Sequence, residues 1–155
     1  MRHTLPVILG VIFLASVCPK APVDTVAPVL SSARLYYDDA AAFPDSTLEV
    51  VRDFATWRGV WDRATSMQPS PPARPAIDFS TEMVILAAAG KMRPGDQIRV
   101  DSAGIRNDVF KIFVRSIVAC QRLGADAYPF EIVSVPRATE PVEWVQTREE
   151  AASCR

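Results

Sequence analysis

Three cysteines and a single histidine have the most distinctive side-chain chemistry in this chain. Cys18 follows an apolar segment, and its removal or lipidation leaves Cys120 and Cys154 as an even pair. Joining these two closes a loop of about 35 residues, a link worth roughly 4 kcal/mol in the chain-entropy model. Two free buried thiols are the alternative, but Cys154 is the second-last residue, and a thiol at a chain end is seldom buried. We therefore predict a disulfide between Cys120 and Cys154 that holds the C-terminal tail.

The histidine, His3, lies in a segment that we expect to be removed. A mature chain without imidazole cannot form a Ser-His-Asp triad, a Cys-His pair or a histidine metal site. The sequence also lacks the glycine-rich loops that bind nucleotides, and it contains no C-x-x-C pair. Asp38 and Asp39 lack the spaced oxygen ligands of a calcium loop, so we interpret them as a solvated turn. We predict a protein with no catalytic residue, no cofactor and no metal site.

The composition is that of a globular protein with a single domain. The chain has 155 residues, of which 49% are hydrophobic and 23% are charged. Its 17 basic and 18 acidic residues give a net charge of −1. A nucleic-acid-binding protein would normally show a basic excess, so we predict that this protein does not bind nucleic acid.

The N-terminal segment has the pattern of a secretory signal. Arg2 precedes an apolar run over residues 7–17, and prolines follow directly. The run is too short for a membrane-spanning helix, which needs about 20 apolar residues. We predict that the protein is exported to the cell envelope, the periplasm or the extracellular space.

The end of this signal leaves two alternatives open. The sequence Leu-Ala-Ser-Val-Cys over residues 14–18 is similar to a bacterial lipoprotein signal, although Val17 stands where a small residue is usual. Residues 1–18 are the predicted signal peptide, and either Cys18 is lipidated or the protein is secreted without a lipid. Residues 19–32 are rich in proline and form a predicted tether.

Residues 33–155 alternate apolar segments with polar turns and form the predicted domain. One segment, residues 83–89, is apolar almost throughout, which is typical of a central strand covered on both sides. The short connections favour antiparallel neighbours. We predict a single α+β domain, mostly antiparallel sheet, with one short helix over residues 53–65. The predicted strands are residues 34–37, 48–51, 83–89, 97–100, 109–118 with a break near 115–116, 129–135 and 142–146.

The predicted helix begins after Asp53, whose carboxylate can accept hydrogen bonds from the first turn. Phe54, Trp57, Trp61 and Ala64 follow at spacings of three and four residues, which places them on one helical face. Large aromatic residues at this spacing usually belong to a core, so we interpret the face as core; an aromatic binding platform is the alternative.

Four motifs follow one another along the chain: a helix with paired tryptophans, an Asp-Phe element before an apolar strand, a glycine turn, and a strand between two prolines. In their order and spacing, from Trp57 to Val145, these motifs resemble the PrcB-like family of protease-complex accessory proteins. The family commonly has Gly-Gly-Tyr in the glycine turn, where this chain continues with Asp-Gln after Gly95. The residues that carry the motifs are Trp57, Trp61, Asp78, Phe79, Gly90, Gly95, Pro129 and Pro136.

The same residues have structural interpretations of their own. We expect Asp78 to anchor its loop by accepting backbone N–H groups, and Phe79 to join the core. We expect Gly90 and Gly95 to supply backbone conformations with positive φ.

The resemblance implies a non-catalytic exported domain that binds, and stabilises, a partner protein such as a secreted protease. A small-ligand or glycan-binding envelope domain is the alternative, and it would need a pocket lined by residues such as Tyr36, Tyr37 or Tyr128. A hydrolase that uses distant carboxylates is a third hypothesis. Its candidates are Asp78, Glu82 and Glu131, which have no distinguishing sequence context.

Overall fold

The computed structural model describes residues 32–120 and 124–154. The predicted signal peptide, Cys18 and nearly all of the predicted tether lie outside the described residues. Within the described ranges, no helix is long and apolar enough to cross a membrane.

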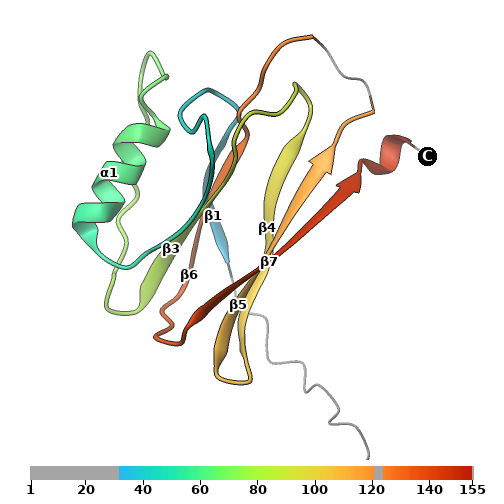
Figure 1. Cartoon of the computed structure of the whole chain (residues 1–155). Helices are drawn as coiled ribbons and strands as arrows, with labels where there is room; N and C mark the ends of the chain where they lie inside the picture. The colour runs from blue at the N-terminus through green and yellow to red at the C-terminus, as the bar shows by residue number, and fades with distance from the viewer. Residues whose placement is uncertain (1–31, 121–123, 155) are drawn as a thin grey trace, which may run out of the picture.

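The described residues form seven strands, one α-helix and a short 3-10 helix (Figure 1). The α-helix and two strands precede a long central strand, and four further strands follow. In chain order the elements are β1 (Ala33–Asp38), β2 (Ser46–Val51), α1 (Phe54–Ala64), β3 (Glu82–Ala89), β4 (Gln97–Arg106), β5 (Val109–Val118), β6 (Phe130–Pro136), β7 (Val142–Glu150) and η1 (Ala152–Cys154).

The strands make two sheets, one in the order β1-β6-β3-β2 and the other in the order β4-β5-β7. All strand pairs are antiparallel except β5 and β7, which run parallel. The predicted α+β class, with mostly antiparallel sheet and one short α-helix, is therefore confirmed. The expectation that neighbouring strands are antiparallel is wrong for β5 and β7. Between these two strands the chain forms β6 in the other sheet, and this crossover allows β7 to run parallel to β5.

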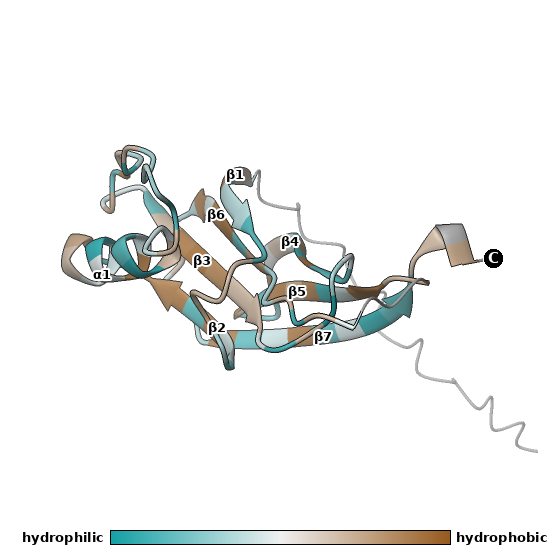
Figure 2. Ribbon diagram, turned by 90° about the horizontal axis from the view of Figure 1, so that it is seen from above, coloured by the Kyte–Doolittle hydropathy of each residue, from teal (hydrophilic) through white to brown (hydrophobic). Residues whose placement is uncertain are grey.

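The domain has three layers, which Figure 2 shows edge-on: the helix, the four-stranded sheet and the three-stranded sheet. β3 lies between two cores, as the apolar run over residues 83–89 predicted. Val84, Leu86 and Ala88 belong to the core under the helix. The alternate residues of β3 belong to the core between the two sheets, together with Phe110 and Ile112 of β5.

The helix α1 begins as the sequence predicted. The Asp53 carboxylate accepts a hydrogen bond from the Thr56 N–H at 2.9 Å and caps the first turn. Trp57, Trp61 and Ala64 are buried against the four-stranded sheet, so the core interpretation of this face is confirmed for them. Phe54 is 57% exposed, which corrects its assignment to that face.

Phe54 departs from the pattern because it is the first residue of the helix, and its ring lies beside the loop that follows α1. The Arg74 guanidinium carbon is 4.9 Å from the centre of that ring. Helical spacing alone does not indicate where the underlying sheet ends. The predicted buried face was therefore one turn too long at the start of the helix.

Three strand predictions also need correction. β7 runs to Glu150, beyond the predicted end at residue 146, because its polar second half is exposed and so lacks the apolar pattern. β4 runs to Arg106, well beyond residue 100. The prediction stopped too early because an irregularity between Val100 and Ser102 shifts the alternation of polar and apolar side chains. β5 continues through Arg115 and Ser116 without the predicted break. Arg115 lies opposite Arg99 in the register of β4 and β5, but it forms its ion pair with Asp101 of β4. This ion pair allows the charged residue to lie within the strand.

Candidate functional site

The predicted disulfide is present. Cys120 and Cys154 are bonded, with their Cα atoms 5.2 Å apart. The bond joins the chain just after β5 to η1, which follows β7. The Ala151 N–H also donates to the Val118 carbonyl at 2.9 Å, so the C-terminal tail is held beside the end of β5 by two kinds of link.

The tryptophans and the Asp-Phe element build the helix side of the fold. The Trp57 and Trp61 indole N–H groups donate to the carbonyls of Pro75 and Pro72, at 3.2 and 3.3 Å. The proline-rich loop contains no helix or strand, and these two bonds hold it against the helix. Phe79 is partly buried and packs against the same core.

Asp78 anchors the turn before β3, as predicted. Its Oδ1 accepts hydrogen bonds from the Ser80 hydroxyl at 2.6 Å and from the Ser80 N–H at 2.9 Å. These bonds, the hydroxyl first, lower the pKa of the Asp78 carboxyl below its usual value because they favour the charged form. Asp78 is thus committed to its own turn.

The glycines and prolines of the motifs lie at the ends of strands. Gly90 and Gly95 have φ values of +72° and +90°, as predicted. A Cβ on Gly90 would lie only 2.7 Å from the Ser46 backbone nitrogen, so this position also requires the absence of a side chain. The Pro129 carbonyl accepts the Ala89 N–H at 3.0 Å, and Pro136 is the last residue of β6. The motif residues are therefore spread over the fold and do not converge on one site.

Glu131, one of the three carboxylates considered for hydrolysis, is almost completely buried in β6, with 1% of its surface exposed. Its Oε1 accepts hydrogen bonds from Arg34 Nε of β1 at 2.6 Å and from Arg99 Nη1 of β4 at 3.2 Å. Its Oε2 accepts the Val100 N–H of β4 at 2.6 Å. The carboxylate therefore links the edge strands of the two sheets.

Tyr37 lies next to this carboxylate and contacts one of its arginine partners. It lies opposite Glu131 in the β1–β6 register, and the Arg99 guanidinium carbon is 4.7 Å from the centre of its ring. Burial is the main cause that raises the pKa of the Tyr37 hydroxyl. The sequence carried a signal for this group, namely one acidic residue inside a strand whose other residues are apolar except for Ser134.

The three carboxylates do not form a pair in a described cavity. Asp78 accepts hydrogen bonds within its own turn, and Glu131 accepts one from strand β4. Of the three carboxylates, only Glu82 lines a described cavity. The geometry of Glu131, with hydrogen bonds to both oxygens, is that of a structural link between strands.

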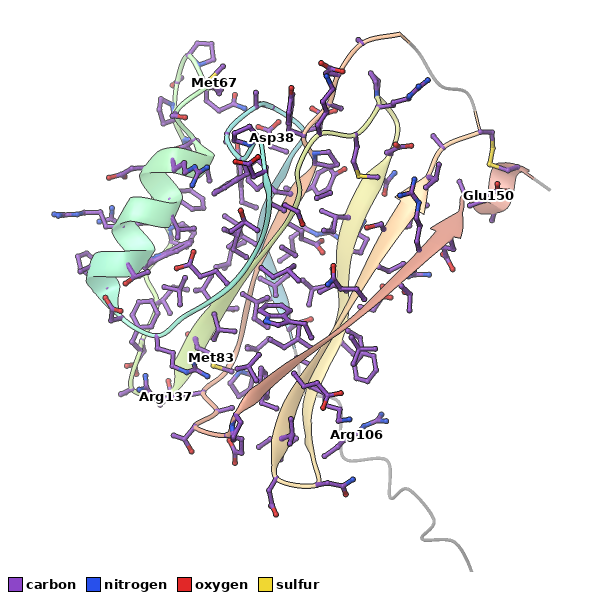
Figure 3. All side chains as sticks on the ribbon, viewed as in Figure 1. Asp38, Met67, Met83, Arg106, Arg137 and Glu150 are labelled. Carbon is purple, nitrogen blue, oxygen red and sulfur yellow. A yellow bond between two sulfur atoms is a disulfide. The ribbon has the colours of Figure 1, made fainter. Side chains whose placement is uncertain are left out.

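The solvent-facing side of the β4-β5-β7 sheet, which we call the outer face, carries a small apolar centre between ion pairs. Phe113 of β5 lies opposite Val145 of β7, and both are partly exposed. On one side, the Lys111 and Glu143 side chains are 3.0 Å apart. The Arg106 guanidinium carbon lies 5.4 Å from the centre of the Phe113 ring, and Figure 3 labels Arg106 near the hairpin between β4 and β5.

Arg115 joins all three strands on the other side of this centre. Its guanidinium forms ion pairs with Asp101 of β4 at 2.7 Å and with Glu149 of β7 at 2.8 Å. The hydrogen bond to Asp101 is the main cause that raises the pKa of Arg115 above its usual value. Exposed pairs of this kind contribute little stability, so their main effect here is to order the charged side chains around Phe113.

β7 is the terminal strand of its sheet, and within the described residues β5 is its one strand neighbour. It is nine residues long, and residues 146–150 are exposed. Its charged residues are three glutamates and one arginine, which give the strand an acidic character. They are Glu143, Arg148, Glu149 and Glu150.

A cleft of about 500 Å³ lies between the β3–β4 turn, the segment before β6 and the end of β7; we call it the turn cleft. Asp96 is buried at its edge and accepts the N–H groups of Arg93 and Ala119, at 3.2 and 2.8 Å. The residues that line the turn cleft are Lys91, Met92, Arg93, Asp96, Gly124, Ala125, Asp126 and Arg148.

The tyrosines named for a ligand pocket line none of the described cavities. Tyr36 donates to Asp38 at 3.0 Å and packs against Trp61, with ring centres 5.3 Å apart. Burial is the main cause that raises the pKa of Tyr36. Tyr128 uses its N–H to bond the Asp39 carbonyl at 2.8 Å.

Comparison with known proteins found no match: no family model, no curated protein and no solved structure is similar to this chain. Within the described residues, no group of three or more His, Cys, Asp or Glu side chains is placed to hold a metal ion. The PrcB-like resemblance therefore rests on the sequence motifs alone.

Proposed function

We propose that this protein is a non-catalytic exported accessory domain that binds and stabilises a partner protein, such as a secreted protease. The observation that carries the proposal is the outer face with its terminal strand β7, where an apolar centre lies beside a strand edge that no other described strand pairs with. The motifs that resemble the PrcB-like family supply the class of partner.

Two features support export. The first is the charged and apolar pattern of residues 1–18, which is typical of a secretory signal. The second is the bond between Cys120 and Cys154, because disulfides persist mainly in oxidising compartments.

The unpaired edge of β7 supports binding by strand addition. An edge strand presents N–H and C=O groups that an extended segment of another protein can bind. β7 is long enough for this, and its exposed half offers access from solvent. Val145 would supply apolar contact beside the added strand, and Phe113 lies one strand further into the sheet.

The charges of β7 indicate what kind of segment would fit. Three glutamates and one arginine on nine residues favour a partner strand with lysine or arginine side chains. Glu143 and Glu149 are about half exposed even though each is already paired with a cation of β5, so both can accept a further ion pair. We therefore propose an extended, basic segment of the partner as the occupant of this edge.

Site-specific photo-crosslinking in the native host tests this proposal. A photoreactive residue at Thr147, exposed on β7, should give a discrete adduct with one protein, whereas the same residue at Arg58, exposed on α1, should not. The crosslinked peptide of the partner should be extended and basic, because it must lie along the acidic edge.

Charge reversals on β7 and on α1 test whether this crosslink is specific to the acidic edge. The double variant Glu143→Lys/Glu149→Lys should lose most of the Thr147 adduct, whereas Asp62→Lys on α1 should retain it. The abundance of the partner should also fall when the gene for this chain is deleted. The proposal is wrong if Thr147 gives no adduct, or if Thr147 and Arg58 give the same adducts.

A further inference from the structure

We propose that the turn cleft binds a small anionic ligand through a phosphate or carboxylate group. This site shares Arg148 with the end of β7, whose edge the proposed function uses, but the inference does not depend on that function. It rests on the volume of the turn cleft, on the charges of its lining and on the way its walls are fixed.

The lining of the turn cleft carries a positive charge. In its described lining, Lys91, Arg93 and Arg148 are cationic and Asp96 and Asp126 are anionic, which gives these residues a net charge of +1. This is opposite in sign to the protein as a whole, whose net charge is −1. A concave surface focuses such a charge and attracts ions of the opposite sign.

The two arginines are the groups available to a ligand. Lys91 is paired with Asp126 at 2.8 Å, and this hydrogen bond is the main cause that raises the pKa of Lys91. In the described part of the chain, Arg93 and Arg148 have no ion-pair partner, although both line the same cleft. Guanidinium groups bind carboxylates and phosphates through paired hydrogen bonds, which suits them to an oxyanion.

The carboxylate of Asp96 does not compete for these arginines. It is buried, and its two oxygens accept the N–H groups of Arg93 and Ala119. Asp96 thereby ties the β3–β4 turn to the end of β5, next to the disulfide at Cys120.

Backbone hydrogen bonds join two walls of the cleft. Met92 and Ala127 exchange two backbone hydrogen bonds, at 2.8 and 3.1 Å, which join the β3–β4 turn to the segment before β6. The backbone of Arg148 is held by the pairing of β7 with β5. A preformed site loses less conformational entropy on binding than one that must be ordered by its ligand.

The volume of about 500 Å³ fits a small molecule. Among the described residues, the lining is polar and charged and contains no aromatic side chain. This favours a compact, strongly charged ligand over a sugar ring, which usually stacks on an aromatic side chain. An acidic segment of a protein would offer the same carboxylate chemistry, and the experiment below separates it from a small molecule.

The test is a titration of the purified, oxidised protein, followed by NMR, with inorganic phosphate, with citrate and with a short polyglutamate peptide. We expect saturable shifts of the amides of the β3–β4 turn and of the end of β7 with phosphate or citrate. Whichever of these two anions binds more tightly identifies the group that the site recognises. The peptide should bind no more tightly, per carboxylate, than citrate does.

Variants of the two arginines assign the binding to the cleft. Arg93→Gln and Arg148→Gln should each weaken binding by about tenfold, because each removes a charge-assisted hydrogen bond. Arg58→Gln on α1 removes the same charge elsewhere and should leave the affinity unchanged. All three side chains are exposed, so the variants should fold like the parent protein.

Three results would overturn the proposal. The first is the absence of saturable shifts with both phosphate and citrate. The second is an equal loss of affinity in all three variants, which would show attraction to net charge without a site. The third is tighter binding of polyglutamate, per carboxylate, than of citrate, which would identify the turn cleft as a contact for an acidic protein.

Discussion

Replacing Glu131 by glutamine should lower the free energy of unfolding by about 3 kcal/mol. The buried carboxylate accepts hydrogen bonds from Arg34, from Arg99 and from the Val100 N–H. Glutamine offers one acceptor oxygen and turns an NH₂ group toward donors, so at least one of these three groups loses its partner. The loss is limited because the Arg34 side chain is about half exposed, whereas the Val100 N–H is buried. Urea denaturation of the purified variant measures the change.

The matched control is Glu143→Gln, which removes an equivalent charge from an exposed pair on the outer face. We expect that control to change the free energy of unfolding by less than about 1 kcal/mol. If the two variants were equally stable, the carboxylate of Glu131 would not be the link between the sheets that its contacts indicate.

Removing the disulfide with Cys154→Ser should cost about 4 kcal/mol in the chain-entropy model, since the bonded residues are 34 positions apart. The unfolded chain gains freedom when the loop opens, and η1 loses its covalent link to the end of β5. Thermal unfolding of the oxidised protein, the reduced protein and the variant measures the effect. The reduced protein should match the variant, because both lack the same bond.

The double variant Cys120→Ser/Cys154→Ser should be as stable as the single variant, since one bond is lost in each. A Cys154→Ser variant as stable as the oxidised parent would show that the bond constrains a tail that the rest of the fold does not need. In that case amide exchange should increase in residues 151–154 alone.

The features that the sequence predicted correctly depend on neighbouring residues or on the small number of cysteines. Asp53 caps α1 because a capping carboxylate acts on the turn directly after it. The unbroken apolar character of β3 follows from burial on both faces. Cys120 and Cys154 could be paired because few alternatives were left once Cys18 was set aside.

The features that the sequence missed depend on residues distant along the chain. β5 continues through Arg115 because Asp101 and Glu149 on neighbouring strands neutralise its charge. The parallel pairing of β5 with β7 depends on where β6 lies, and that cannot be inferred from the length of the connections. The turn cleft combines residues 91–96, 124–126 and 148, which share no sequence motif.

The most direct test of the central claim, that the edge of β7 receives a segment of the partner, is hydrogen exchange on the purified complex. Amides of β7 should exchange more slowly in the complex than in the isolated protein, while those of α1 should be unchanged, because strand addition bonds the free edge of β7 alone. Unchanged exchange in β7, together with new protection in α1 or at the turn cleft, would contradict the account and place the partner elsewhere.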